Sequence, residues 1–306
     1  MKFSVVIPVY KAPETLAPLH LKISEELSKV TSDYEIIFVN DACPLGSWNQ
    51  IQRICKLDSR TKGVNLVRNF GQHPAIFAGL KSATGDWIFV LDCDLQDDPK
   101  YMLALYEKAL EGYDVVLAKR SERKESRCKK LQSWLFYKVL KIVLDVKMDH
   151  QIANFGIYSK NTIDASMLMG DRIRFFPYLI SWLGFPTASV VVSQDSRYEG
   201  VSSYSFTRAL KLAFDIAISS SNRPLFFSVI VGAICAGISF TLGLYFIIRY
   251  FTLGYVPSGW TSLSVTVLFS TGLILLNLGI LGLYLARTYD QTKQRPIFLI
   301  EKRINF

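Results

Sequence analysis

The 306-residue sequence lacks the short motifs that mark several large enzyme classes. No G-x-G-x-x-G and no G-x-x-x-x-G-K-[ST] follows an expected strand, which counts against a dinucleotide oxidoreductase and a P-loop NTPase. The five cysteines are scattered without a C-x-x-C pair, so neither a disulfide framework nor a zinc knuckle is supported. No Ser-His or His-Asp arrangement for nucleophilic catalysis is evident. A nucleotide, if one binds, would be held by acids and a metal ion.

Charge is nearly absent between Leu225 and Ala286, where Arg249 is the only charged residue. Two apolar runs, Leu225 to Ile248 and Leu263 to Ala286, are each long enough to cross a hydrocarbon core of about 30 Å. The alternative is a buried hairpin in a soluble core, but core helices seldom run this long without a polar face. The sequence therefore predicts two membrane helices.

No secretory signal peptide is visible, because the apolar stretch Phe3 to Ile7 is too short for one and meets Pro8. Basic residues flank the two apolar runs on their outer sides, whereas the loop Tyr250 to Trp260 between them carries no charge. The positive-inside rule then places both chain ends in the cytoplasm. The net charge of +9 suits either nucleic acid or an anionic membrane, and the two spans favour the lipid bilayer over nucleic acid. We expect a multi-pass protein of the inner, cytoplasmic membrane.

An apolar run that ends abruptly in acid, Trp87 to Pro99, is the most informative stretch. Its first part predicts a strand buried on both faces, which would place the acids at the carboxyl edge of a sheet, where open α/β sheets bind ligands. Asp92 and Asp94 are two apart, so on an extended chain their side chains point the same way, and Gln96 continues this row. Such oxygen ligands suit Mg2+ or Mn2+ together with substrate phosphates. The spacing fits equally well an acidic turn before a helix that begins at Pro99.

The first two thirds of the chain alternate between expected strands and expected helices. The early strands are predicted at Phe3 to Ile7, Tyr34 to Val39, Gly63 to Val67 and Trp87 to Leu91. Later strands are predicted at Asp114 to Ala118 and Thr187 to Val192. Helices are predicted at Thr15 to Val30, from Ser47 with a capping box to Gln50, and from Pro74. This alternation favours a parallel sheet with right-handed crossovers.

Four motifs carry a resemblance to a known family: Val5-Val6-Ile7-Pro8-Val9-Tyr10, Asp41 after a strand, Arg68-Asn69-Phe70-Gly71, and Asp92-x-Asp94-x-Gln96-Asp97. In this order they resemble the inverting GT-A glycosyltransferases of family 2. More narrowly they resemble the polyprenyl-phosphate glycosyltransferases, which include dolichol-phosphate mannose synthase and the bacterial GtrB-type enzymes. The resemblance covers nearly the whole chain, because the bacterial group also has two C-terminal membrane helices and a short basic tail, here Gln294-Arg295-Pro296.

The resemblance implies an α/β fold class, with a Rossmann-like, mostly parallel GT-A domain plus two C-terminal transmembrane helices. A cytoplasmic catalytic domain is expected at residues 1–203 and an amphipathic interfacial helix at 204–224. Two transmembrane helices with a short external loop are expected at 225–286, and a cytoplasmic basic tail at 287–306. A homo-oligomer, in the bacterial relatives a tetramer, is implied as well.

The family comparison also implies roles for single residues. It places the metal ion on Asp92, Asp94 and Gln96, and a contact to the nucleotide base or ribose on Asp41, with the backbone around Pro8 and Tyr10 lining the same pocket. This chain has Asn40-Asp41-Ala42-Cys43 where the family usually has Asp-Asp-Gly-Ser. Asn40 can still hydrogen-bond a base edge or ribose, and the choice between uracil and guanine stays open. The alternative for Asp41 is a simple turn residue.

A basic loop, Lys119 to Lys130, precedes an expected amphipathic helix at Leu131 to Leu144. Such a segment can lie on an anionic leaflet and bind a phosphate headgroup, and a solvated charged loop is the alternative. The family's acceptor-phosphate arginines fall in this loop, which implies that role for Arg120 and Arg123.

A second family run, Arg-x-x-Gly-x-Ser-Lys-Tyr-Ser, corresponds to Arg197 to Ser205, with Ser203 in place of the usual lysine. Arg197 remains to pair with a diphosphate or with the acceptor phosphate, and its planar donors suit that task. Asn154 and Gly156 stand where relatives carry an acid and an arginine, which weakens any claim for a catalytic carboxylate there.

The resemblance implies a metal-dependent polyprenyl-phosphate hexosyltransferase that moves a sugar, with inversion, from a nucleotide-diphosphate sugar to a polyprenyl phosphate such as undecaprenyl phosphate. A UDP-sugar is the favoured donor. The expected catalytic residues are Asp94, Arg123 and Arg197. The expected substrate-binding residues are Pro8, Tyr10, Asn40, Asp41, Arg68, Asp92, Arg120 and Ser202. Two alternatives stay open: a non-catalytic membrane scaffold with a degenerate glycosyltransferase fold, and a processive polysaccharide synthase, against which the absence of a Gln-x-x-Arg-Trp motif counts.

Overall fold

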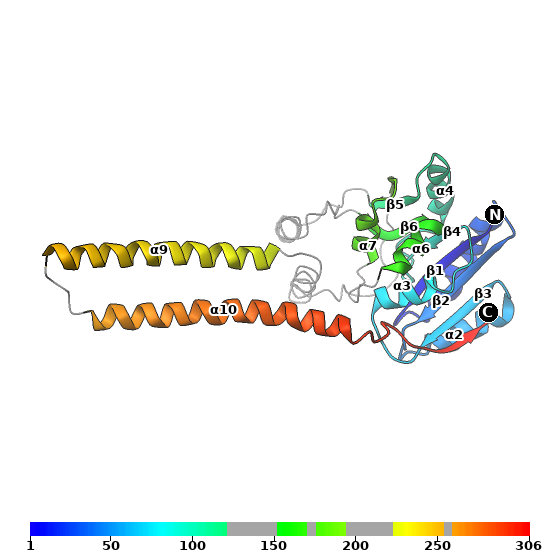
Figure 1. The fold of residues 1–306 in the computed structure, drawn as a ribbon. Helices are drawn as coiled ribbons and strands as arrows, with labels where there is room; N and C mark the ends of the chain where they lie inside the picture. The colour runs from blue at the N-terminus through cyan, green and yellow to red at the C-terminus, as the bar shows by residue number, and fades with distance from the viewer. Residues whose placement is uncertain (121–151, 170–175, 194–222, 254–258) are drawn as a thin grey trace. The chain divides into compact units, whose positions relative to one another are not determined.

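The structure is a computed structural model that describes residues 1–120, 152–169, 176–193, 223–253 and 259–306 (Figure 1). The chain forms two compact units. The first, here called the sheet domain, includes the described residues up to 193 together with residues 295–306. The second, the helical unit, includes residues 223–253 and 259–294.

The sheet domain contains an eight-stranded sheet in the order β7-β5-β6-β4-β1-β2-β3-β8. Four neighbouring strands are parallel to one another: β1 (Phe3–Val9), β2 (Tyr34–Asn40), β3 (Thr61–Leu66) and β4 (Trp87–Val90). On one side of these, β6 (Ile152–Ser159) is antiparallel to both β4 and β5 (Val115–Arg120), and β7 (Thr187–Val192) is parallel to β5. On the other side, β8 (Ile300–Ile304) is antiparallel to β3. The mostly parallel α/β sheet that the sequence predicted is confirmed.

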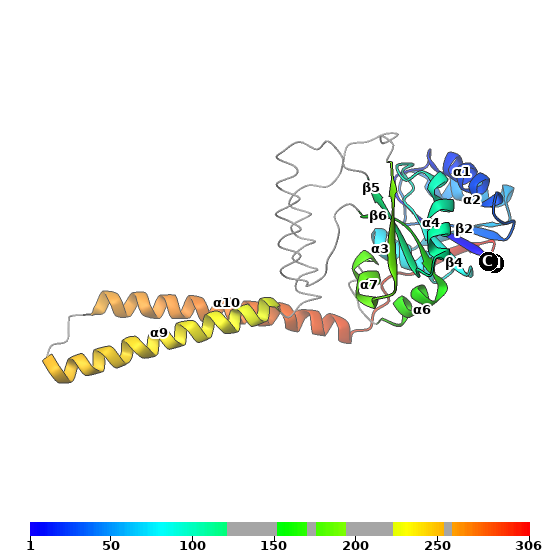
Figure 2. The same cartoon turned by 90° about the horizontal axis from the view of Figure 1, so that it is seen from above.

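Helices cover both faces of this sheet (Figure 2). One face carries α1 (Leu16–Ser28), α2 (Ser47–Leu57) and α4 (Met102–Leu110), the last preceded by the short 3-10 helix η1 (Pro99–Tyr101). The opposite face carries α3 (Gln72–Leu80), α6 (Lys160–Leu168) and α7 (Phe176–Leu183). Phe176 of α7 makes edge-to-face contacts with Phe77 of α3 and Tyr158 of β6. Because two helix layers enclose the sheet, β1 and β2 are buried along their whole length.

Several element boundaries differ from the sequence prediction. β1 continues through Pro8 to Val9, because β1 pairs with β4 only as far as Val6 and the missing N–H of Pro8 lies beyond that pairing. The capping box predicted at Ser47 is absent: Gly46 occupies the N-cap position in the left-handed conformation, and no side chain caps the helix. α3 begins at Gln72, two residues before the predicted Pro74.

The strand at the carboxyl terminus was not predicted, since residues 287–306 were expected to form only a basic tail. β8 instead pairs with the outer edge of β3, and the backbone N–H of Val67 donates to the carbonyl of Leu299 (3.0 Å). Asn305 fixes the other end, because its Nδ2 donates to the carbonyl oxygens of Cys55 and Thr61, each at 2.8 Å. The last residues of the chain are therefore part of the sheet domain.

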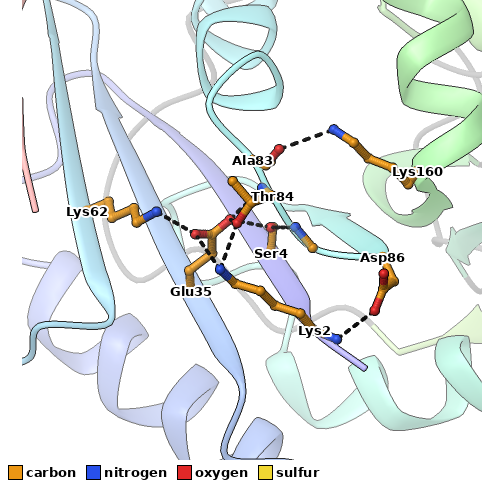
Figure 3. Close-up of polar contacts among 9 residues, drawn as sticks. Lys2, Ser4, Glu35, Lys62, Ala83, Thr84, Asp86 and Lys160 are labelled. Carbon is orange, nitrogen blue, oxygen red and sulfur yellow. Dashed lines mark hydrogen bonds and ion pairs between the residues drawn. The ribbon is translucent and has the colours of Figure 1, made fainter. Parts of the chain in front are cut away.

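At the amino-terminal edge of the parallel strands, one buried carboxylate links neighbouring strands. This is Glu35, at the start of β2 (Figure 3). Its Oε1 accepts hydrogen bonds from Ser4 Oγ on β1 (2.6 Å) and from the backbone N–H of Thr84 in the segment before β4 (2.7 Å). Its Oε2 lies 2.7 Å from Lys62 Nζ on β3 and 3.5 Å from Lys2 Nζ. Burial alone would raise the pKa of Glu35, but the contacts with Lys62, Ser4 and Thr84 outweigh it and lower the pKa to about 2.

The segment before β4 packs tightly against the start of β1. The backbone N–H of Gly85 donates to Ser4 Oγ (2.8 Å), and a Cβ at Gly85 would lie 2.6 Å from the backbone nitrogen of Ser4, so only glycine fits here. The backbone N–H of Lys2 donates to Asp86 Oδ2 (2.8 Å). Lys160 at the start of α6 donates to the carbonyl of Ala83 (3.2 Å; Figure 3). These contacts hold the entrance of β4 in register with β1.

The helical unit consists of two long apolar helices, α9 (Arg223–Leu253) and α10 (Trp260–Thr292), which pack side by side (Figure 1). Their candidate membrane spans are Leu225–Arg249, with a mean hydropathy of 2.3, and Val265–Thr292, with a mean hydropathy of 2.0. Most of their large apolar side chains are exposed, unlike those of the core helix of a soluble domain. By length and composition, both helices can span a membrane, as the sequence predicted.

Candidate functional site

Polar residues follow each of the four parallel strands at the same edge of the sheet. Tyr10 follows β1, Asp41 follows β2, Arg68 lies just past β3, and Asp92 lies just past β4. The strand order β4-β1-β2-β3 makes these four strand ends neighbours. This edge is opposite to the one that Glu35 joins, and the carboxyl ends of parallel strands are where open α/β sheets bind ligands.

Asp92 is held by two side-chain amides. Gln72 Nε2, in the first residue of α3, donates to Asp92 Oδ1 (2.7 Å). Asn154 Nδ2, on β6, lies 3.3 Å from Oδ2 and 3.5 Å from Oδ1 of the same carboxylate. The antiparallel pairing of Val90 with Gly156 explains the second contact, because it carries Asn154 back alongside Asp92. The carboxylate is thus oriented by groups from both neighbouring elements.

The backbone after β4 is not extended, so the geometry assumed for the Asp92, Asp94 and Gln96 row is wrong. β4 ends at Val90, and Leu95 has a positive φ of 59°. The backbone N–H of Gln96 donates to Asp94 Oδ1 (3.1 Å), which is the hydrogen bond of a tight turn. Gln96 itself is buried, with 6% of its surface exposed, whereas Asp92 and Asp94 are half-buried. Metal binding by these three residues stays a prediction, and the two aspartates are the more accessible of the three.

The donor set fits a divalent cation that shares its coordination with a ligand. Asp92 and Asp94 supply carboxylate oxygens, the ligand type that Mg2+ and Mn2+ prefer. Among the residues that the structure describes, no group of three or more His, Cys, Asp or Glu side chains is placed to hold a metal ion. Mg2+ commonly relies on one or two carboxylates plus substrate phosphates and water, so two aspartates are sufficient only when phosphate oxygens complete the shell.

Asn40 is buried at the end of β2 and uses both ends of its amide. Its Nδ2 donates to Asn65 Oδ1 on β3 (2.6 Å), and its Oδ1 accepts from the backbone N–H of Cys43 (3.4 Å). Asn65 Nδ2 donates in turn to Glu301 Oε2 on β8 (2.7 Å). Asn40 therefore shapes the loop after β2, and the contact to base or ribose expected of its side chain stays a prediction.

Asp41, next along the chain, accepts two backbone hydrogen bonds. The N–H groups of Phe70 and Gly71 donate to its two carboxylate oxygens at 2.7 and 2.9 Å. Burial raises the pKa of Asp41, and these two hydrogen bonds offset part of that rise. The carboxylate thus ties the loop after β2 to the loop before α3. Arg68 in the latter loop is exposed and lies over the ring of Phe70, with its guanidinium carbon 4.8 Å from the ring centroid.

The loop after β1 meets the loop after β2 at the Cys43 thiol. The backbone N–H of Lys11 and the Oγ of Ser47 donate to Cys43 Sγ at 3.1 and 3.0 Å. Burial would raise the pKa of Cys43, but the bonds from Ser47 and from the backbone of Leu45 and Lys11 outweigh it and lower the pKa. Tyr10 is 42% exposed at this edge. These contacts hold the predicted pocket residues Pro8 and Tyr10 beside Asn40 and Asp41.

Three of the predicted site residues, Arg123, Arg197 and Ser202, lie outside the described residues, and so do the predicted helices at Leu131 to Leu144 and 204–224. Arg120 is the last residue of β5. Gln72, Asn65 and Asn154 were not predicted as site residues from the sequence, because each acts through another residue. The only signal was at Asn154, which replaces an acid of the related enzymes.

Comparisons with known proteins agree with the fold. The family model described as glycosyl transferase family 2 matches residues 4–165. The uncharacterized glycosyltransferase YkcC of Bacillus subtilis is 33% identical over 306 residues, covering 99% of this chain and 94% of that protein. A prophage bactoprenol glucosyl transferase homolog of Escherichia coli is 33% identical over 304 residues, covering 99% of each protein. The bactoprenol glucosyl transferase of Shigella phage SfX is 33% identical over 305 residues, covering 99% of this chain and all of that protein (100%).

Proposed function

Since this chain belongs to glycosyl transferase family 2, we propose that it transfers a sugar from a nucleotide-diphosphate sugar, with UDP-sugars favoured, to a polyprenyl phosphate. The observation that carries this proposal is the full-length similarity to proteins named bactoprenol glucosyl transferases. The acidic strand ends support it because they can hold a cation that neutralises the anionic donor, and the two apolar helices support it because the acceptor is a membrane lipid. The reaction then takes place at the cytoplasmic face of the inner membrane, with both chain ends in the cytoplasm.

Asp92 and Asp94 hold a divalent cation, Mg2+ or Mn2+, in this proposal. When bound, the cation supplies positive charge that neutralises the donor's diphosphate and its leaving group. Gln72 and Asn154 orient the Asp92 carboxylate through their amide N–H groups. Hydrogen bonds of this kind orient a ligating carboxylate.

The pocket for the nucleotide lies where the loops after β1, β2 and β3 meet. Asn40 and Asp41 fix the backbone of these loops, and the exposed Tyr10 and Arg68 lie at the same edge of the sheet. Arg68 contributes a planar donor group suited to a phosphate, and Tyr10 contributes an aromatic face. On the acceptor side, Arg120, Arg123, Arg197 and Ser202 bind the lipid phosphate and the diphosphate.

The chemical step needs positioning and charge more than a general base. An oxygen of the acceptor phosphate attacks the anomeric carbon from the face opposite the diphosphate. The new carbon–oxygen bond forms as the bond to the nucleoside diphosphate breaks, and the configuration inverts. A phosphate monoester is largely ionised at neutral pH, so its attacking oxygen has no proton to lose. The arginines bring two anions together and stabilise the departing one.

A transfer assay on the full chain in detergent tests this proposal. Radiolabelled UDP-glucose, UDP-N-acetylglucosamine and GDP-mannose are each mixed with undecaprenyl phosphate and Mn2+. We expect one donor to yield a single-sugar lipid phosphate of inverted configuration, and EDTA to stop the reaction. A polymer would instead indicate a processive synthase. Absence of lipid-linked product with every donor would contradict the proposal and favour a non-catalytic scaffold.

A further inference from the structure

A series of hydrogen bonds runs from Glu301 on β8 through Asn65 and Asn40 to the loop after β2. Every group in this series has a fixed role as donor or acceptor. Glu301 lies at a β-bulge: Lys302 is opposite Asn65 and Ile300 is opposite Leu66, so Glu301 is the residue of β8 without a partner on β3. A bulge of this kind re-aims a side chain. Here Glu301 Oε2 accepts from Asn65 Nδ2 at 2.7 Å.

The carboxylate of Glu301 at one end and the backbone N–H of Cys43 at the other determine how both asparagine amides between them are oriented. A carboxylate only accepts hydrogen bonds, and a backbone N–H only donates. Glu301 therefore requires Asn65 to present its Nδ2, which leaves Asn65 Oδ1 for Asn40 Nδ2 (2.6 Å). Asn40 then has its Oδ1 available for the backbone N–H of Cys43 (3.4 Å). Each donor along the chain meets an acceptor.

Reversing the two central amides would cost free energy, because both are buried. Asn40 and Asn65 are buried, with 3% and 8% of their surfaces exposed. Two buried amides that face each other donor to donor would leave both groups unsatisfied, which costs more than a single lost hydrogen bond. Glu301 is exposed to solvent, so it links the surface of β8 to two buried groups at the base of the loop after β2.

We propose that Glu301 of β8 is a positioning residue for the nucleotide pocket, acting through Asn65 and Asn40 on the loop after β2. This inference rests on the proposed function, because that loop is where the nucleotide is proposed to bind. Through Glu301, the C-terminal strand β8 helps to position the loop at which the donor is proposed to bind. Its contribution is orientation, and Glu301 itself does not contact the donor.

Three substitutions at Glu301 separate this role from a general effect on β8. Glu301→Gln keeps an oxygen that accepts from Asn65, so we expect donor binding close to that of the wild type. Glu301→Ala lets water accept in place of the carboxylate, and we expect the KM for the donor to rise about threefold. Glu301→Lys places a donor against Asn65 and inverts both amides, so we expect a rise of about tenfold or more with kcat little changed. Arg303→Glu on the same strand is the charge-reversal control and should leave the KM unchanged.

Hydrogen–deuterium exchange of the full chain provides a readout that does not depend on catalysis. The exchange rate of residues 41–46 should increase in Glu301→Lys and equal that of the wild type in Glu301→Gln. The exchange rate of β3 should be unchanged in both variants. Unchanged exchange and an unchanged KM in Glu301→Lys would overturn the positioning role. If the wild type transfers no sugar while exchange in residues 41–46 still follows Glu301, the proposed function fails and the positioning of this loop stands.

Discussion

Replacing Asp94 with asparagine is expected to lower sugar transfer on the order of a thousandfold. The asparagine side chain keeps an oxygen that accepts from the backbone N–H of Gln96, so the turn after β4 is preserved. What it removes is the negative charge that, with Asp92, is proposed to hold the cation. Transfer is measured as the initial rate of lipid-linked sugar formation by the full chain in detergent.

Two comparisons make the Asp94→Asn result interpretable. Asp164→Asn on α6 removes an exposed acid that pairs with Lys160 one helical turn away, and should transfer sugar at the wild-type rate. The thermal unfolding midpoints of both variants should match that of the wild type, which excludes a folding defect. Near-normal transfer by Asp94→Asn would show that no cation depends on this residue.

Replacing Glu35 with glutamine is expected to destabilise the sheet domain by about 3 kcal/mol. The carboxylate joins β1, β2, β3 and the segment before β4, and it is 2% exposed. The glutamine oxygen can accept from Ser4 and Thr84 only if the Nε2 amide group faces the ammonium of Lys62, where donor meets donor. A loss of this size should lower the unfolding midpoint by about 10 °C.

The same carboxylate predicts how stability depends on pH. The pKa of Glu35 is about 2 in the folded chain, against an ordinary value of 4.5. Because the folded state binds this proton more weakly than the unfolded state, the stabilisation is complete above pH 4.5 and is lost as the pH falls through 2. The wild type should therefore lose about 1.4 kcal/mol per pH unit from this group within that window, and Glu35→Gln should lack this contribution.

Glu111→Gln is the matched control for Glu35→Gln. Glu111 is exposed at the end of α4, where it pairs with Lys108, and exposed pairs of this kind contribute little to stability. Its unfolding midpoint should equal that of the wild type at every pH. Equal midpoints for Glu35→Gln and Glu111→Gln would contradict the structural role given to Glu35. Donor binding by Glu35→Gln below its unfolding midpoint should equal that of the wild type, because Glu35 lies at the edge of the sheet away from the candidate site.

The parallel core of the fold was predictable because its sequence pattern is local. Each of the first four strands is a short apolar run, and the helices between them have helical spacing, so alternation alone indicated a parallel sheet. β6 was missed because its residues 152–159 mix small, polar and aromatic side chains. β8 was missed because an edge strand held by backbone hydrogen bonds has only two half-buried side chains, Ile300 and Ile304, to mark it.

The candidate site was predictable in position but not in its hydrogen bonds. The residues after the strands, such as Asp41 and Asp92, could be placed at one edge from topology alone. That Asp41 accepts from Phe70 and Gly71 depends on loop conformation, which no short motif in the sequence encodes. The turn at Leu95 depends likewise on a left-handed residue that is not glycine, so the sequence suggested an extended row in its place.

UDP binding in the presence and absence of a divalent cation tests the central claim most directly. The full chain in detergent is heated with UDP and Mn2+, with UDP and EDTA, and with Mn2+ alone, and the unfolding midpoint is recorded for each. A ligand that binds only the folded state raises this midpoint. We expect UDP to raise it with Mn2+ but not with EDTA, and to have no effect on Asp94→Asn. An equal rise in EDTA, or an equal rise in Asp94→Asn, would contradict a cation held by Asp92 and Asp94 as the basis of donor binding.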